Sequence, residues 1–269
     1  MRAAVLGSPV AHSLSPALHR AAYDALGLRG WSYEAVEVVP AGLAAFLAGL
    51  GADWAGLSLT MPLKQAVLPL LASRSSLVEL TGVANTVVAG EGGWHGDNTD
   101  VAGIVAALRE AGVCSCSRAA VLGAGATAAS ALVALHELGA HQVRVLARSV
   151  ERALALQPVA DGLGVELRVG TLHPLEVEDR WPQVVVSTVP AGALDAFAAA
   201  SDPGPEAPAL LDVVYAPWPT PLARVYARAG GVVVGGAAML LHQAARQVEL
   251  MTGRPAPLDA MRAALPAPR

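Results

Sequence analysis

Short apolar runs alternate along the chain with longer segments, rich in Ala and Leu, whose apolar positions recur at the spacing of a helix. This alternation is typical of α/β layers built on parallel strands. In the first part of the chain the predicted strands are Arg2–Leu6, Tyr33–Val38, Ala55–Thr60 and Asn85–Ala89. The predicted helices there are Ser15–Leu26, Ala41–Leu50, Pro62–Leu70 and a long helix that begins after Asp97–Thr99 and ends near Gly112.

A second series of strands begins after the small, polar segment Gly112–Arg118. Its predicted strands are Ala119–Leu122, Gln142–Leu146, Glu166–Val169, Val184–Thr188, Leu210–Val214 and Val232–Val234. The last long segment, Ala237–Met251, has a helical pattern and no strand after it, so we expect it to pack back on the first series. The pattern predicts one domain from residues 1–103 with 237–269, and a second from residues 104–236.

Composition excludes several classes of protein. Of the 269 residues 54% are hydrophobic and 15% are charged, which rules out a disordered chain. The net charge of -4, with no run of basic residues, argues against a nucleic-acid binder. The longest uncharged stretch, Ala119–Leu135, is too short and too often interrupted to cross a membrane, and no secretory signal is evident. Cys114 and Cys116 are too close together in the sequence for a disulfide bond between them to stabilise the fold. Because proteins without structural disulfides are typical of a reducing compartment, we expect a cytoplasmic protein.

One lysine stands out against the rest of the basic residues. Lys64 is the single Lys beside 17 Arg, and Asn and Ile are depleted in the same way, as a bias toward GC-rich codons would produce. Arg stays protonated in proteins, whereas Lys can give up a proton, so a site that needs acid–base chemistry cannot accept Arg instead. We therefore take Lys64 as a candidate proton donor; the alternative is a surface residue that the bias missed.

A glycine-rich turn follows the strand at Ala119–Leu122. The residues from Gly123 to Ala128 fit Gly-x-Gly-x-x-Gly/Ala between a strand and a helix, a context in which backbone N–H groups hold a pyrophosphate. The candidate cofactor residues of this turn are Gly123, Ala124, Gly125, Ala126, Thr127 and Ala128. The motif predicts a Rossmann-like second domain, although a chance tight turn in a Gly- and Ala-rich chain would look the same.

The next strand indicates which dinucleotide is bound. An NAD site places Asp or Glu at the end of this strand, where it binds the ribose 2′-hydroxyl. Here the strand ends at Ala147 and is followed by Arg148, with Arg152 four residues later. Guanidinium groups suit a 2′-phosphate, so the sequence predicts NADP. Arg152 has the alternative of a solvated position on a helix face.

With this site placed, nearly the whole chain resembles the shikimate dehydrogenase family. The motifs that carry the resemblance, in the order of the family, are Gly7–Pro16, Gly56–Lys64, Ala84–Thr86, Asp97–Asp100, Ala147–Ser149, Asp212–Pro217 and Gly236–Gln243. Two residues depart from the family pattern. Ser58 stands where the family usually has Asn, and Ala147 stands where it has the Asn of an Asn-Arg-Thr turn, which removes a side-chain contact to the cofactor.

The resemblance implies a substrate domain with a mostly parallel sheet beside the Rossmann-like domain, and it implies roles for particular residues. The catalytic pair would be Lys64 and Asp100. The substrate would be bound by Ser13, Ser15, Thr60, Asn85, Tyr215 and Gln243. The cofactor would be bound by the glycine-rich turn together with Ala147, Arg148, Ser149, Arg152, Thr188, Val189, Gly236 and Met239.

Each of these roles has a plainer structural alternative. Asp100 suits the negative charge favoured in the first turn of a helix, and Asn85 suits a turn. Ser15 before Pro16 suits a helix N-cap, and Gln243 suits an exposed polar position. The seven His are scattered without partners at metal-ligand spacing, so we expect no metal site.

The resemblance implies an enzyme that reduces 3-dehydroshikimate to shikimate with NADPH, in the biosynthesis of chorismate and the aromatic amino acids. One alternative is an NAD- or NADP-dependent quinate/shikimate dehydrogenase; its NAD-linked form would want an acidic residue near position 147. Another is a dinucleotide-binding regulator without turnover, against which the presence of both Lys64 and Asp100 argues. The expected partner is a small-molecule substrate, and the chain is expected to be a monomer or a homodimer.

Overall fold

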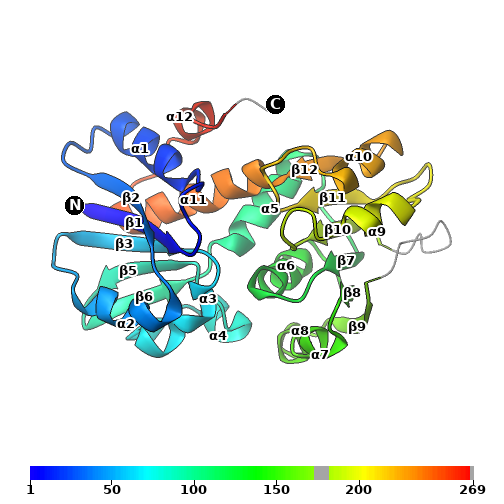
Figure 1. Cartoon of the computed structure of the whole chain (residues 1–269), viewed down its shortest axis with the longest axis horizontal. Helices are drawn as coiled ribbons and strands as arrows, with labels where there is room; N and C mark the ends of the chain where they lie inside the picture. Colours follow the sequence, from blue (N-terminus) through cyan, green and yellow to red (C-terminus); the bar gives the residue numbers. More distant parts are fainter. Residues whose placement is uncertain (173–181, 267–269) are drawn as a thin grey trace. The chain divides into compact units, whose positions relative to one another are not determined.

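The computed structural model describes residues 1–172 and 182–266, and within them the chain forms two compact α/β units (Figure 1). The first unit is Met1–Gly103 with the segment that begins at Leu240, and the second is Ile104–Met239. Both boundaries lie inside helices, namely α5 (Asp100–Glu110) and α11 (Gly236–Thr252). Residues 173–181 and 267–269, which belong to the predicted domain ranges, lie outside the described residues.

A six-stranded sheet forms the centre of the first unit. Its strands are β1 (Arg2–Gly7), β2 (Ser32–Glu37), β3 (Trp54–Leu59), β4 (Ser73–Arg74), β5 (Thr86–Gly90) and β6 (Gly93–Asp97). The strands lie in the order β2-β1-β3-β5-β6-β4. β1 pairs in parallel with both β2 and β3, and β4 pairs in parallel with β6.

Helices cover both faces of this sheet. They are α1 (Ser15–Ala25), α2 (Pro40–Ala48), α3 (Leu63–Ala66), α4 (Ser76–Thr81), α11 and α12 (Leu258–Ala263). Successive side chains of a strand point to opposite faces, so β1 contributes Ala4 and Leu6 to one core and Ala3 and Val5 to another. The first core includes α2, α3 and α4, whereas the second includes residues of α1 and α11. The buried β3 is thus held between two layers of helices.

The predicted strands and the long helices of the first unit are present within a few residues of their expected bounds, but several details differ. β5 runs antiparallel to β3 and to β6, and the hairpin β5–β6, the short strand β4 and helix α4 were not predicted. The predicted helix Pro62–Leu70 is split into α3 and a 3₁₀ turn at Leu68–Leu70. Pro69 explains the split, because proline has no N–H to continue an α-helical ladder.

The second unit is a sheet of six parallel strands. They are β7 (Arg118–Leu122), β8 (Gln142–Ala147), β9 (Glu166–Thr171), β10 (Val184–Ser187), β11 (Ala209–Asp212) and β12 (Val233–Gly235). The order β12-β11-β10-β7-β8-β9 reverses direction between β7 and β10. This is the doubly wound order of a dinucleotide-binding fold, whose ligands lie at the switch point beyond the carboxyl ends of the strands. The predicted fold class is therefore confirmed.

The helices of the second unit are α5, α6 (Ala126–Glu137), α7 (Val150–Leu154), α8 (Gln157–Leu163), α9 (Asp195–Ala200) and α10 (Pro221–Arg228). α6 packs on β7, and its residues from Ala128 to Leu135 are all buried. α9 and α10 contribute Phe197 and Tyr226 to a core with β7 and β10. Among the described residues, no helix is both long enough and apolar enough to span a membrane.

Candidate active site

Lys64 and Asp100 form an ion pair in the first unit. Lys64 lies on α3, which begins at Leu63, shortly after the buried strand β3 ends at Leu59, and Asp100 is the first residue of α5. The Lys64 Nζ contacts Asp100 Oδ2, and the two side chains are 14% and 5% exposed. An ion pair this far removed from water is held in place, because leaving either charge unpaired would be costly.

Asn85 lies beside this pair and fixes the second oxygen of the carboxylate. Its Nδ2 donates to Asp100 Oδ1 at 2.7 Å, and its Oδ1 accepts from the Thr99 N–H at 2.8 Å. The backbone N–H of Thr99 can only donate, so it determines which end of the Asn85 amide faces Asp100. The alternative role of Asp100, as a mere helix-start charge, does not account for contacts to both of its oxygens. The neighbouring Asp97 accepts from Ser75 and from the Asn98 N–H instead.

Gln243 joins the same cluster from α11. Its Oε1 accepts from Asn85 Nδ2 at 3.3 Å, and its Nε2 donates to the carbonyl of Leu240 at 2.9 Å. The side chain is buried, so the alternative of an exposed polar residue is wrong. Lys64, Asp100, Asn85 and Gln243, which are distant in the sequence, thus share one hydrogen-bonded cluster. We call these four residues the polar cluster.

The other substrate residues predicted for this unit make no hydrogen bond to the polar cluster among the described residues. Thr60 is half-buried and directly follows β3. At the start of α1, Ser13 Oγ accepts from the Ser15 N–H at 3.3 Å. The N-cap of α1 is Leu14, and no side chain caps the helix, so the alternative that assigned the cap to Ser15 is wrong. Within the described residues, the structure shows no hydrogen bond that occupies the hydroxyl of Ser15 or Thr60.

The glycine-rich turn of the second unit lies at the switch point of its sheet. Gly123 has a φ of +113°, a conformation that other residues rarely adopt. A Cβ atom at this position would lie 2.5 Å from Thr188 Oγ1 and 2.9 Å from Val189 Cγ1. Thr188 itself donates to the carbonyl of Leu122 at 3.0 Å. The turn therefore requires glycine, and it brings three of the predicted cofactor residues together.

Helix α6 begins at this turn, and among the described residues the N–H groups of Ala126 and Thr127 have no backbone partner, whereas that of Ala128 donates to the Gly125 carbonyl at 3.0 Å. Gly125 is its N-cap residue and has no side chain to cap the helix. The first N–H groups of a helix have no partner within the helix, so they suit an anionic ligand. No Cβ contact is found within 4 Å of Gly125, which leaves open space beside the turn. These residues fit the pyrophosphate of a dinucleotide.

The predicted 2′-phosphate residues lie at the end of β8. Ala147 is buried as the last residue of the strand, and Arg148 and Arg152 are exposed. Ser149 caps α7 by accepting from the Arg152 N–H at 3.2 Å. Within the described residues, no hydrogen bond or ion pair occupies either guanidinium group. Both cations are thus available to a ligand beyond the end of β8.

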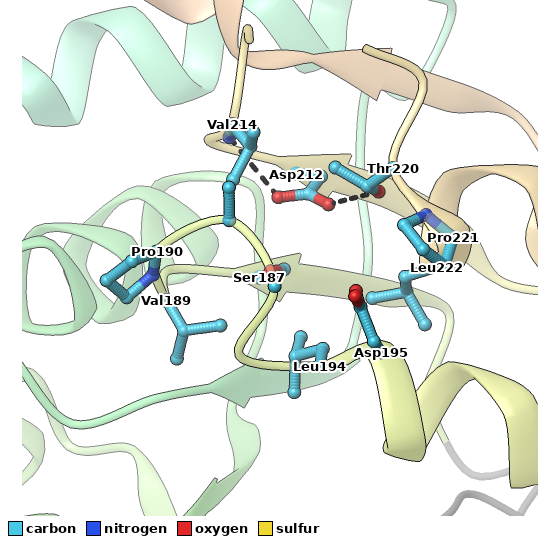
Figure 2. A pocket seen from close by; sticks show the side chains of 12 residues that line it. Ser187, Val189, Pro190, Leu194, Asp195, Asp212, Val214, Thr220, Pro221 and Leu222 are labelled. Carbon is cyan, nitrogen blue, oxygen red and sulfur yellow. Dashed lines mark hydrogen bonds between the residues drawn. The ribbon is translucent and has the colours of Figure 1, made fainter. Parts of the chain in front are cut away.

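A small pocket lies between the ends of β10 and β11 and the starts of α9 and α10 (Figure 2). In it, Asp212 accepts from Thr220 Oγ1 at 2.8 Å and from the Val214 N–H at 3.2 Å. Burial raises the pKa of Asp212 above its usual value, and these hydrogen bonds oppose the shift. The Asp212 carboxylate thus holds both ends of the loop from Val214 to Thr220. This loop carries Tyr215, which is half-buried and whose pKa is raised by burial.

Two further residues predicted to bind the cofactor, Gly236 and Met239, lie on α11. The Gly236 N–H donates to the carbonyl of Val214 at 3.2 Å, and a Cβ atom at Gly236 would overlap the backbone of Val213. Met239 is buried on α11. The sequence prediction missed Asp212 as the anchor of the loop, although an acidic residue at the end of a buried apolar strand was a usable signal. Among the described residues, no group of three potential ligands could hold a metal ion.

Comparisons with known proteins bear on both units. A model of the shikimate dehydrogenase substrate-binding domain matches residues 5–87, and a model of the shikimate 5′-dehydrogenase C-terminal domain matches residues 236–265. A shikimate dehydrogenase (NADP(+)) of Thermosynechococcus vestitus is 38% identical over 97% of this chain and 93% of its own length. The chain belongs to the shikimate dehydrogenase family.

Solved structures of shikimate dehydrogenases agree with this membership. The Mycobacterium tuberculosis shikimate dehydrogenase is 43% identical, with a TM-score of 0.88 and 98% coverage of both chains. A shikimate 5-dehydrogenase of Thermus thermophilus, in complex with NADP(H) and shikimate, is 35% identical with a TM-score of 0.83 and 98% coverage of both chains. The resemblance found in the motifs is thereby confirmed, and the chain is an oxidoreductase of an NADP-dependent family.

Proposed function

We propose that the protein catalyses the reversible NADPH-dependent reduction of 3-dehydroshikimate to shikimate, a step in the biosynthesis of aromatic amino acids. The polar cluster carries this proposal. Reduction of a ring ketone needs a proton donor at the carbonyl oxygen and an ordered set of donors and acceptors for the neighbouring hydroxyls. Lys64 provides the proton donor, and Asn85 and Gln243 provide paired amide donors and acceptors.

Each residue has a defined task in this reaction. Bound NADPH supplies the hydride to the carbonyl carbon. Lys64 Nζ donates a proton to the carbonyl oxygen, and in the reverse direction it removes that proton from the hydroxyl. Asp100 holds the ammonium in place, and Asn85 holds Asp100 from its other side. Ser13, Ser15, Thr60 and Tyr215 bind the substrate, with the serine hydroxyls on its carboxylate.

The second unit holds the cofactor in this proposal. The start of α6 receives the pyrophosphate, and Arg148 and Arg152 receive the 2′-phosphate of NADP. Ala147, Ser149, Thr188, Val189, Gly236 and Met239 complete the cofactor site. The absence of an acidic residue at the end of β8 supports NADP over NAD. We place the enzyme in the cytoplasm as a monomer or homodimer, which sedimentation of the purified protein would resolve.

Initial rates with shikimate and quinate, each measured with NADP and NAD, test the proposal. We expect turnover of shikimate with NADP to be the fastest of the four combinations. Comparable rates with quinate and NAD would identify a quinate/shikimate dehydrogenase instead. Binding of NADP without turnover of either ring substrate would identify a regulator and overturn the proposed function.

A further inference from the structure

Gln247 is a buried polar residue of α11 that has no role in the reaction proposed for this protein. It lies four residues after Gln243, on the same helix, and is 1% exposed. Its Oε1 accepts from Ser58 Oγ at 2.8 Å, and Ser58 accepts from the Tyr33 hydroxyl at 2.5 Å. Its Nε2 donates to Thr86 Oγ1 at 3.0 Å and to the carbonyl of Asn85 at 3.3 Å. Gln247 thus connects three strands of the first sheet to the polar cluster.

Backbone groups determine the direction of these hydrogen bonds. The carbonyl of Asn85 can only accept, so the Gln247 atom beside it must be Nε2, and Oε1 must face Ser58. Because Oε1 can only accept, the Ser58 hydroxyl must donate to it and receive its own hydrogen bond from Tyr33. Thr86 receives the Nε2 donor, which leaves its hydroxyl proton for Asn85 Oδ1 at 2.8 Å.

This directed chain ends at the amide that faces the catalytic pair. Asn85 Oδ1 accepts from Thr86 and from the backbone of Thr99, so its Nδ2 is turned toward Asp100. Without the donor from Gln247, the Thr86 hydroxyl proton is no longer fixed on Asn85 Oδ1, because it can turn to Thr99 Oγ1 at 3.2 Å instead. In a buried network, an amide that turns over would set its oxygen against the Asp100 carboxylate.

We propose that Gln247 is a positioning residue of the active site: through Thr86 it reinforces the orientation that the Thr99 N–H gives the Asn85 amide, and it supplies a carboxamide beside Ser58, which lacks one. Ser58 stands where the family pattern has Asn, and the Gln247 amide lies in hydrogen-bond contact with its hydroxyl. The expected effect of Gln247 on turnover rests on the proposed function, whereas its effect on the orientation of the Asn85 amide does not.

A spectroscopic experiment tests the orientation itself without any turnover. The chain contains two Asn residues, Asn85 and Asn98, so selective ¹⁵N labelling of Asn gives two pairs of side-chain amide signals. Gln247→Met keeps the length of the side chain and removes its hydrogen bonds. We expect this variant to shift or broaden the Asn85 pair and to leave the Asn98 pair in place. Unchanged Asn85 signals in a folded Gln247→Met protein would overturn the proposal.

Kinetics supply the second readout. For Gln247→Met we expect kcat/KM for shikimate to fall about tenfold or more, as is common when a support of an active-site residue is lost, while the KM for NADP stays within about twofold. Val248→Ala is the matched control, because Val248 is a fully buried neighbour on α11 outside this network. If Val248→Ala lowered kcat/KM to the same extent, the effect of Gln247 would be one of packing, and the proposal would fail.

A paired exchange keeps the proposal testable if Gln247→Met does not fold. Gln247→Ala removes the carboxamide, and Ser58→Asn adds one on the facing strand. We expect each single variant to be impaired, Ser58→Asn by crowding, and the double variant to regain most of the lost kcat/KM. Strictly additive losses would show that the two positions do not share one carboxamide. An inactive wild-type protein would refute the proposed function, whereas the Asn85 signals would still decide the role of Gln247.

Discussion

At the scale of single residues, the proposed reaction depends on a property of Lys64 that the arginines of the chain do not share, namely the ability to give up a proton. Its ammonium contacts Asp100, whose other oxygen is held by Asn85. Both oxygens of the carboxylate are therefore occupied, and the ammonium has one well-defined position. A proton donor needs this fixed geometry more than it needs a positive charge.

Lys64→Arg separates the charge from the proton transfer. Guanidinium keeps the charge but does not release its proton near neutral pH, so we expect kcat for shikimate oxidation to fall about 10²–10⁴-fold. Shikimate and NADP binding, measured by titration calorimetry, are expected to change little. Gln65→Ala, an exposed change on the same short helix, serves as the control. Near-normal kcat in Lys64→Arg would mean that Lys64 acts only as an electrostatic anchor.

Arg148→Ala tests the choice of cofactor. A charge-assisted hydrogen bond contributes about 1.5–3 kcal/mol, so loss of the guanidinium should weaken NADP binding about 10- to 100-fold. NAD has no 2′-phosphate, and its affinity should change far less. Arg118→Ala, an exposed change at the opposite end of the same sheet, provides the comparison. Equal losses for both cofactors would assign Arg148 to adenine stacking.

All four residues of the polar cluster were named by the sequence prediction, from their own chemistry together with the family motifs. Lys64 and Asn85 stand out by the depletion of their residue types. Gln247 was not predicted, because a polar residue on an amphipathic helix is usually exposed. Its burial depends on the pairing of β3 with β5 and on the packing of α11, and neither can be derived from the local pattern.

At the scale of elements, the loop that carries Tyr215 is held at the start of α10. Thr220 caps this helix by accepting from the Ala223 N–H at 3.1 Å, and it also donates to Asp212. One hydroxyl thus joins the helix, the loop and the end of β11. Its loss should affect all three together.

Thr220→Val removes this hydroxyl at nearly constant shape. A lost helix cap costs about 0.5–2 kcal/mol, and the buried Asp212 also loses a donor. We expect the free energy of unfolding to fall by about 1–3 kcal/mol, measured by urea denaturation. Thr220→Ser keeps the hydroxyl and should stay close to the wild type. A Thr220→Val protein as stable as Thr220→Ser would show that the hydroxyl contributes nothing.

The elements that the sequence prediction missed lie in one region of the first unit. The turn Glu91–Gly92 joins β5 to β6, and Gly92 and Gly93, the first residue of β6, have φ values of +83° and +133°. Two adjacent glycines between short strands are a hairpin signal that was available. β6 itself has a weak apolar pattern, with Gly96 packed under Leu71, so its strand conformation depends on pairing with its neighbours.

At the scale of the whole molecule, a buried imidazole links the stability of the fold to pH. His19 lies on α1, stacks on the Tyr33 ring at 3.9 Å, and has its Nδ1 2.9 Å from the carbonyl of Ser15. Burial lowers the pKa of His19 to about 4, and the hydrogen bond to Ser15 opposes part of this shift. The neighbouring Tyr23 and Tyr33 have pKa values raised by burial and stay neutral in acid.

The sign of the pH dependence follows from these values. The unfolded chain takes up a proton on His19 near pH 6.5, whereas the folded protein does so only near pH 4. Acidification through this window therefore removes about 3 kcal/mol of folding free energy. We expect His19→Phe to be less stable at pH 7 and to lose less stability between pH 6.5 and 4, measured by denaturant unfolding across this range. An equal loss in both proteins would show that His19 does not titrate on unfolding.

The order in which the chain is synthesised matters for a unit made of two segments. The first unit needs the segment from Leu240 onward, because Leu241, Ala244 and Val248 form a core with Leu18 and Ala22 of α1. The second unit is formed by one stretch of chain, Ile104–Met239, so it can fold during synthesis before the segment from Leu240 onward has been made. Strands β1 to β6 are synthesised earlier, but at that stage they lack the part of α11 that packs on them. During that interval the apolar face of α1 lacks the partner that covers it in the finished fold, and exposed apolar surface of this kind favours association with other chains.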